Sequence, residues 1–87
     1  AWRISLLRSV EKNLAKIGHG DARRIRSFLY QRIASLDNPR LIGDPLAGPL
    51  KEYWKYRVGD YRLICDIRDG ELVVLVVEIG HRSDIYR

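Results

Sequence analysis

The sequence has 87 residues, of which 46% are hydrophobic and 31% are charged. Its 16 lysine and arginine residues exceed its 11 aspartate and glutamate residues, which gives a formal net charge of +5. A chain of this length buries one small core, so we expect a single domain over residues 1–87. The excess of cations favours an anionic partner, nucleic acid before acidic protein, although a few extra arginines also serve only to keep a domain in solution.

The cysteine content and the distribution of apolar residues exclude several classes of protein. Cys65 is the only cysteine, so an intrachain disulfide and a cluster of zinc-binding thiolates are both excluded. No stretch reaches the roughly 18 to 20 apolar residues of a membrane span, and the region after Ala1 lacks the apolar segment of a signal peptide. We therefore expect a cytoplasmic protein that has no membrane partner.

The first half of the chain predicts a short strand followed by two helices. Residues 2–6 alternate between apolar and polar side chains, as in a half-buried strand. Ser9 is a suitable cap for a first helix that ends at Gly18. Asp21 is a suitable cap for a second helix, whose apolar positions keep helical spacing as far as Leu36.

The second helix also carries several cations, namely Arg23, Arg24, Arg26 and Arg32. A polar face in contact with water accounts for most of them. An anion-binding role for this helix is the secondary interpretation.

Residues 37–50 contain all three prolines and no periodic pattern. Such a segment neither continues a helix nor lies in the middle of a sheet, so it is expected to connect the helices to the sheet. Three apolar side chains are expected to fasten it to the core: Leu41, Ile42 and Leu46.

The second half of the chain predicts three consecutive strands, at residues 53–58, 61–68 and 71–79. Gly59-Asp60 and Asp69-Gly70 are typical two-residue hairpin turns. With the opening strand, these elements predict an α+β fold in which a two-helix hairpin covers one face of a small, mainly antiparallel four-stranded sheet.

Strand periodicity assigns the side chains of this sheet to its two faces, because successive residues point in opposite directions. In the last strand, residues 73, 75, 77 and 79 form one apolar row, and residues 72, 74 and 76 share the other face with Glu78. This strand is therefore expected to be buried on both sides and to lie in the interior of the sheet. If the helices cover the apolar rows, Lys55, Arg57 and Arg62 project together from the uncovered face. Pairing with Asp66 and Glu78 is the alternative explanation for these cations.

The C-terminal tail adds further candidates for chemistry. Arg82 and Tyr86 would be neighbours in a helical turn, whereas an isolated histidine such as His81 is more often structural. Arginines, a lysine, a tyrosine and an imidazole suit a phosphodiester substrate. In RNA the 2′-hydroxyl is itself the nucleophile, so the protein need only transfer protons and stabilise the phosphorane, and neither a metal nor another cofactor is required.

The segment W-K-Y-R-V-G-D-Y-R at residues 54–62, I-G-H-R at 79–82 and the closing I-Y at 85–86 resemble the RelE/ParE superfamily of toxins from toxin–antitoxin systems, and within it the RelE branch. The resemblance spans nearly the whole chain. It implies a ribosome-dependent mRNA endoribonuclease, an mRNA interferase, that cuts codons in the ribosomal A site and arrests translation. It also implies a cognate acidic antitoxin similar to RelB, through which the pair binds operator DNA.

The resemblance carries roles to individual residues. Lys55 is similar to a family lysine that acts in acid–base or phosphate chemistry, Arg62 and Arg82 to phosphate-binding arginines, and Tyr86 to a C-terminal tyrosine. Arg57 falls at a commonly basic position. Tyr53, which is expected to stack on a base, and His81, which is expected to transfer a proton, both stand where some relatives carry lysine.

Two other functions compete with the nuclease. One is a ParE-like inhibitor that binds DNA gyrase, against which the combination of Lys55, Arg62, Arg82 and Tyr86 argues. The other is a toxin homologue that has lost its activity and survives as an antitoxin-binding module.

Overall fold

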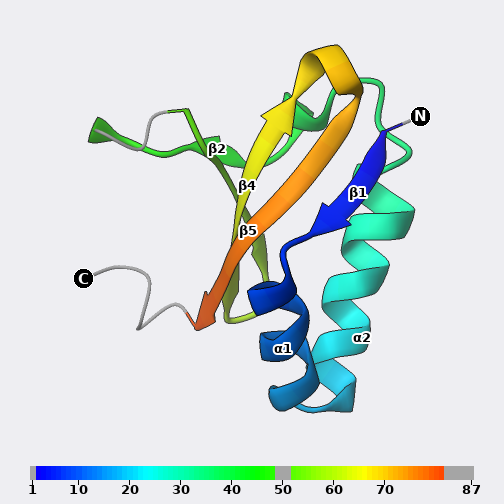
Figure 1. Ribbon diagram of the computed structural model, residues 1–87, viewed down its shortest axis with the longest axis vertical. Helices are drawn as coiled ribbons and strands as arrows, with labels where there is room; N and C mark the ends of the chain where they lie inside the picture. Colours follow the sequence, from blue (N-terminus) through cyan, green and yellow to red (C-terminus); the bar gives the residue numbers. More distant parts are fainter. Residues whose placement is uncertain (1, 49–51, 82–87) are drawn as a thin grey trace.

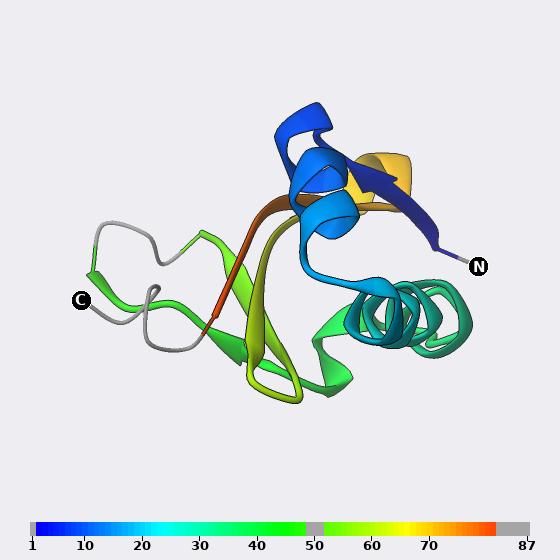
Figure 2. The same ribbon diagram turned by 90° about the horizontal axis from the view of Figure 1, so that it is seen from below.

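The computed structural model describes residues 2–48 and 52–81. A five-stranded sheet has the strand order β1-β5-β4-β3-β2, and the helices lie on one side of it (Figures 1 and 2). The strands are β1 (Arg3–Leu6), β2 (Asp44–Pro45), β3 (Trp54–Val58), β4 (Tyr61–Arg68) and β5 (Val73–His81). β1 pairs parallel with β5, and every other pair is antiparallel. The predicted α+β class and inner position of the last strand are confirmed, but the predicted count of four strands is wrong because β2 adds an edge strand.

The two helices are α1 (Arg8–Lys16) and α2 (His19–Ser27). A π-helical segment, Phe28–Ile33, continues α2, and the Ala34 N–H donates to the Leu29 carbonyl oxygen at 3.0 Å. Gly18, at φ +96°, reverses the chain between the helices, as only glycine does readily. Among the helices that the structure describes, none is both long and apolar enough to cross a membrane.

The predicted helix caps are wrong at both sites. Leu7 precedes α1 and Gly18 precedes α2, and neither start has a side-chain cap. The Leu7 N–H still donates to Val76 of β5 while its carbonyl oxygen already accepts from Val10, so β1 runs directly into α1 and leaves Ser9 inside the helix. At the second start, the Gly18 carbonyl accepts from Ala22, which places Asp21 in the first turn.

Polar contacts hold the connection between α2 and β3 against the sheet. The Trp54 indole N–H donates to the Ile42 carbonyl at 2.8 Å, and the Tyr56 hydroxyl donates to the Pro39 carbonyl at 2.6 Å. Gly43, at φ +86°, packs so closely on β3 that a Cβ atom there would lie 2.6 Å from the Lys55 carbonyl oxygen. Leu41 is 65% exposed, so its predicted role in fastening this segment is wrong, whereas Ile42 does pack on the core.

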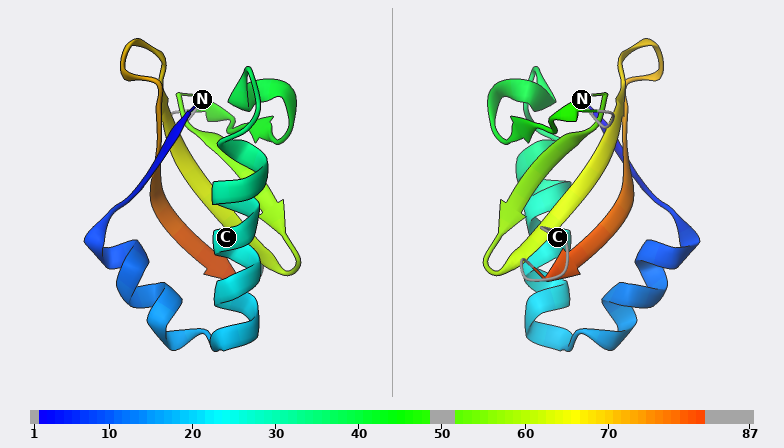
Figure 3. Two further views of the ribbon diagram at one scale, coloured as in Figure 1. Left: turned by 90° about the vertical axis from the view of Figure 1, so that its right-hand side faces the viewer. Right: turned by 90° about the vertical axis from the view of Figure 1, so that its left-hand side faces the viewer.

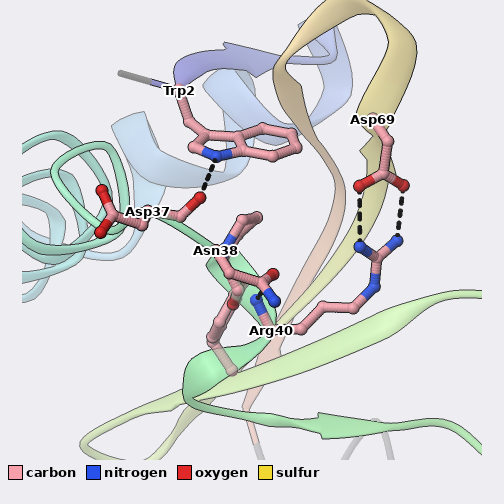
Figure 4. A network of polar contacts seen from close by, with 7 residues as sticks. Trp2, Asp37, Asn38, Arg40 and Asp69 are labelled. Carbon is pink, nitrogen blue, oxygen red and sulfur yellow. Dashed lines mark hydrogen bonds and ion pairs between the residues drawn. The ribbon is translucent and has the colours of Figure 1, made fainter.

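A second set of contacts joins the segment between α2 and β3 to Trp2 and to the β4–β5 turn (Figure 4). The Trp2 indole N–H donates to the Asp37 carbonyl at 3.1 Å. Arg40 donates to both carboxylate oxygens of Asp69, in the β4–β5 turn, at 2.9 and 3.0 Å. The loop at residues 37–42 is therefore bonded both to Trp2, directly before β1, and to the β4–β5 turn.

The two hairpin turns differ from each other. Gly59 and Asp60 form the predicted two-residue turn, with the positive φ of +59° at Gly59 that a type II′ turn requires. The predicted Asp69-Gly70 turn is wrong, since Arg68 pairs with Val73 and four residues intervene. They form a 3-10 turn, Asp69–Glu71, and a left-handed Leu72 whose carbonyl accepts from Arg3 of β1.

The core fills the space between the helices and one face of the sheet. Alternate residues of β3 and β4 belong to it, as predicted: Tyr56, Val58, Leu63, Cys65 and Ile67. In β5 the predicted apolar row is wrong. Ile64 pairs with Glu78 but Cys65 pairs with Val76, so Val77 is the extra residue of a β-bulge. The core residues of β5 are therefore Val74, Val76 and Ile79.

Candidate functional site

Three cations of β3 and β4 lie on the side of the sheet that faces away from the helices: Lys55, Arg57 and Arg62. We call this surface the cation face. Strand register brings the cations together, because Arg57 lies directly opposite Arg62 and Lys55 lies opposite Ile64, two residues further along β4. Directly opposite positions have Cβ atoms about 5 Å apart and diagonal ones about 7–8 Å. The three strand positions therefore share one face of the sheet, as predicted.

Arg62 is the least accessible of the three cations, with only 6% of its surface exposed. Its Nη1 atom is buried, and the neighbouring Ile64 on the same strand is also buried. Charges interact more strongly where water is excluded, and like charges directly opposite in a sheet disfavour each other. A buried arginine beside Arg57 is therefore a favourable position for an anion.

Carboxylates border this face. Asp66 forms an ion pair with Arg68, whose Nε atom lies 3.1 Å from the carboxylate. Glu78 of β5 lies opposite Ile64 of β4. Asp44 of β2 lies opposite Lys55, a neighbour that the sequence did not predict. A two-residue strand in a proline-rich segment leaves no periodic signal, so the sequence offers no means of finding Asp44.

The remaining candidates are Tyr53, His81, Arg82 and Tyr86. Tyr53 is half-buried and lies just before β3, where its carbonyl accepts from the Leu46 N–H at 3.2 Å. Arg82 and Tyr86 lie outside the described residues.

His81 is on the other side of the sheet from the cation face. It lies opposite Tyr61, which packs against the core. The two rings meet edge to face with their centroids 5.7 Å apart. Together with Asp21 and Arg24 of α2, these rings line a small hollow on the helix side. The structure thus brings Lys55, Arg57 and Arg62 together and separates His81 from them.

Two other ionisable side chains, Tyr56 and Cys65, serve the core rather than the site. Burial raises the pKa of the Tyr56 phenol and of the Cys65 thiol well above their ordinary values. Both therefore stay neutral at physiological pH. Within residues 2–48 and 52–81, no group of three histidine, cysteine, aspartate or glutamate side chains could hold a metal ion.

The arrangement on the cation face can bind an anion and stabilise negative charge that develops on it. Guanidinium groups donate paired hydrogen bonds to phosphate oxygens, and Lys55 adds a point charge nearby. Comparison with known protein families identifies the class of the whole chain. Residues 4–86 match the model of the ParE toxin of the parDE type II toxin–antitoxin system.

The chain belongs to the ParE toxin family. The wider RelE/ParE superfamily, to which the sequence motifs pointed, is thereby confirmed. Toxin RelE of Mycobacterium tuberculosis is 28% identical over 86 residues, which are 99% of this chain and 87% of that protein.

Solved toxins share the fold of this ParE-family chain. The RelBE2 toxin–antitoxin complex of M. tuberculosis superposes with a TM-score of 0.83 at 23% identity, over 95% of this chain and 93% of the other. The isolated RelE toxin of E. coli superposes with a TM-score of 0.71 at 21% identity, over 99% and 92% of the two chains. The fold described above is thus RelE-like.

Proposed function

We propose that this toxin is a ribosome-dependent mRNA endoribonuclease that cleaves codons in the ribosomal A site. The observation that carries the proposal is the placement of Arg57 directly opposite a buried Arg62, with Lys55 diagonal to it. These groups suit the phosphate of an RNA backbone, whose negative charge increases as the reaction proceeds.

The proposed reaction is an attack of the RNA 2′-oxygen on the adjacent phosphorus atom. The 2′-hydroxyl gives its proton to a base, the 2′-oxygen bonds to phosphorus, and the bond from phosphorus to the 5′-oxygen breaks. A proton delivered to that oxygen completes the step, which leaves a 2′,3′-cyclic phosphate and a 5′-hydroxyl end. Arg62 stabilises the charge of the phosphorane, and its burial increases this effect.

The other roles come from the family resemblance. Arg82 joins Arg62 in holding the phosphate, while Lys55 and Tyr86 are the groups proposed to transfer protons. Tyr53 and Arg57 bind neighbouring parts of the RNA, the former by stacking on a base. A proton-transfer role for His81 requires the imidazole to leave its contact with Tyr61, since this contact holds the ring on the side of the sheet opposite the cation face.

The proposed partners are the ribosome with its mRNA and an acidic antitoxin similar to RelB. The M. tuberculosis and E. coli relatives have been solved in complexes with their antitoxins, which supports the same kind of partner here. In this proposal the toxin acts in the cytoplasm and reaches operator DNA only through the antitoxin.

Mapping of RNA ends in a translating extract tests the proposal. Purified toxin should cut mRNA within ribosome-bound codons, leave 2′,3′-cyclic phosphate ends, and have little effect on the same RNA without ribosomes. Arg62→Ala and Arg82→Ala should each slow cleavage by on the order of 10²-fold, because each removes transition-state stabilisation. Arg8→Ala, at the exposed start of α1, is the matched control and should cut normally. Full cleavage by both site variants would refute the assignment.

Inhibition of DNA gyrase is the second candidate function, and the match to the ParE model favours it. A gyrase supercoiling assay separates the two candidates. The nuclease proposal expects normal supercoiling at toxin concentrations that stop translation. Inhibited supercoiling with intact mRNA would establish the gyrase inhibitor instead.

A further inference from the structure

The rings of Tyr61 and His81 form the last side-chain pair between β4 and β5 in the described part of the chain. The two residues are direct partners, and their rings meet edge to face at 85° with the centroids 5.7 Å apart. The neighbouring pair on the same side of the sheet, Leu63 and Ile79, lies in the core. In both views of Figure 3, the end of β5 and the β3–β4 turn lie together at the lower end of the sheet, beside α2. The ring pair thus extends the core side of the sheet to the end of β5.

Tyr61 has a position that its surroundings fix. It follows the tight Gly59-Asp60 turn and lies opposite the buried Val58. A Cβ atom on Gly59 would lie 2.7 Å from the Arg24 Nη1 atom, so α2 packs closely against this turn. Tyr61 itself is half-buried and packs on the core. The turn, the core and the helix therefore hold its ring together.

His81 relies more on the contact between the rings. Its side chain is exposed, so burial contributes little to its position. Charged groups of both signs from Asp21, Arg24 and Asp60 line the hollow that it shares with Tyr61. An edge-to-face contact adds attraction beyond the burial of the two rings. Loss of the Tyr61 ring should therefore loosen the end of β5.

The ring pair is adjacent in the chain to both arginines that are proposed to hold the phosphate. Arg62 directly follows Tyr61, and it projects onto the cation face because strand neighbours point to opposite faces. Arg82 directly follows His81. A contact on the helix side of the sheet thus sets the backbone from which Arg62 projects, and the backbone from which the chain continues to Arg82.

Two arginines act on one phosphate only when their separation matches its oxygens. Guanidinium hydrogen bonds are directional, and misplacement of a binding group by about 1 Å can cost up to about 10²-fold in rate. Gly80, which lies opposite Arg62, has no side chain to fix this separation on the cation face. The side-chain contact nearest to both arginines on the other face is the ring pair.

We propose that Tyr61 and His81 are positioning residues for the two arginines of the proposed site. Their contact holds the start of the C-terminal tail so that Arg82 acts on the phosphate that Arg62 binds. In this role the imidazole of His81 acts as a ring and transfers no proton. The inference rests on the proposed function for its effect on cleavage, whereas the contact between the rings is a property of the free protein.

Substitutions that keep or remove each ring test the proposal. Tyr61→Phe and His81→Phe keep an aromatic ring, so each should cut mRNA on ribosomes within about threefold of the wild type. Tyr61→Leu and His81→Leu remove a ring. Each should lower kcat by on the order of 10-fold and change KM for programmed ribosomes less than about twofold, because the arginines are displaced rather than removed. The double leucine variant should be no slower than either single variant, since both break one contact. Additive losses would overturn the proposal.

The pH dependence of kcat separates positioning from proton transfer. If His81 transferred a proton, His81→Phe would lose as much activity as His81→Leu, and its pH profile would differ from that of the wild type. The proposal expects profiles of the same shape for the wild type and His81→Phe. Slow cleavage by His81→Phe together with an altered profile would refute the positioning role.

Amide hydrogen exchange tests the ring contact without ribosomes or RNA. In Tyr61→Leu the amides of residues 79–81 should exchange at least about 10-fold faster than in the wild type, and in Tyr61→Phe at the wild-type rate. The amide of Val74, in the core part of β5, is the control and should keep its rate in both variants. Unchanged exchange at residues 79–81 in Tyr61→Leu would refute the contact. The expected exchange in a toxin that cuts no RNA would refute the proposed function, and the role of the rings in cleavage with it, but not the contact.

Discussion

The two sides of β3 and β4 place neighbouring residues in opposite environments. Leu63 and Cys65 are inaccessible to solvent in the core, whereas Arg62, the residue before Leu63 in the same strand, belongs to the cation face. On the helix side, apolar contacts stabilise the fold. On the other side, Arg57 and Arg62 lie directly opposite each other, an arrangement that is unfavourable for the sheet.

This difference separates the residues needed for folding from those needed for binding. Like charges directly opposite each other do not stabilise a sheet, and in the proposed function the cation face serves to bind an anionic ligand. It follows that substitutions on the core side should reduce stability first, and substitutions on the cation face should reduce activity first.

The largest expected effect on folding is in the core side of β4. Leu63→Ala removes a fully buried side chain and should lower the free energy of unfolding by about 2–5 kcal/mol. Urea unfolding followed by circular dichroism measures this change. Ser5→Ala, at an exposed position of β1, is the control for a substitution that leaves the core intact. A loss below about 1 kcal/mol for Leu63→Ala would place this residue outside the main core.

A smaller loss of stability is expected at Tyr56, where the core contacts the segment between α2 and β3. Tyr56→Phe keeps the ring that packs on Phe28 but removes the hydroxyl that donates to the Pro39 carbonyl at 2.6 Å. The buried carbonyl loses its hydrogen bond, which should cost about 1–3 kcal/mol. Tyr61→Phe, whose residue is only half-buried, should cost less. The same unfolding measurement decides, and equal losses for the two variants would contradict the contact.

The smallest effect on stability is expected at the ion pair between Arg40 and Asp69, in the turn between β4 and β5. Hydrogen bonds from Arg40 lower the pKa of the exposed Asp69 carboxyl below its ordinary value. A depressed pKa contributes stability that is present above the ordinary aspartate pKa of about 3.9 and is lost as the pH falls through the lower folded value. The stability difference between wild type and Asp69→Asn should therefore shrink below about pH 4.

Urea unfolding at a series of pH values measures that difference. Glu71→Gln, in the same turn, is the control for general loss of negative charge. A difference between wild type and Asp69→Asn that is independent of pH would show that the ion pair does not stabilise the turn.

The sequence predicts both sides of β3 and β4 because apolar residues recur at every second position from Trp54 to Val58 and from Tyr61 to Ile67. In β5 the same reasoning fails. Residues 72–77 are all apolar, so nothing in the sequence marks Val77 as the bulge that reverses the facing of Ile79. The separation of His81 from Arg62 does not depend on this bulge, since His81 lies two residues after Ile79 and shares its face once the strand continues past Ile79.

Other features depended on contacts between distant segments. The pairing of Asp44 with Lys55 relies on Gly43 packing against β3, and no local pattern indicates it. The arginines of α2 were correctly expected on its polar surface, but their position beside Arg57 required knowledge of how the helix lies on the sheet. The cation face was thus predictable from strand periodicity alone, whereas the position of α2 beside the end of β3 was not.

Parallel measurement of stability and cleavage in Arg62→Leu tests the central claim most directly. Leucine retains an apolar side chain at this buried position but cannot bind phosphate. We predict that its free energy of unfolding equals or exceeds that of the wild type while mRNA cleavage on ribosomes falls by on the order of 10²-fold. Arg68→Leu, on the same face of β4, should cut normally. Cleavage by Arg62→Leu within about twofold of wild type, or unfolding of that variant under native conditions, would contradict the claim that this face is reserved for an anionic substrate.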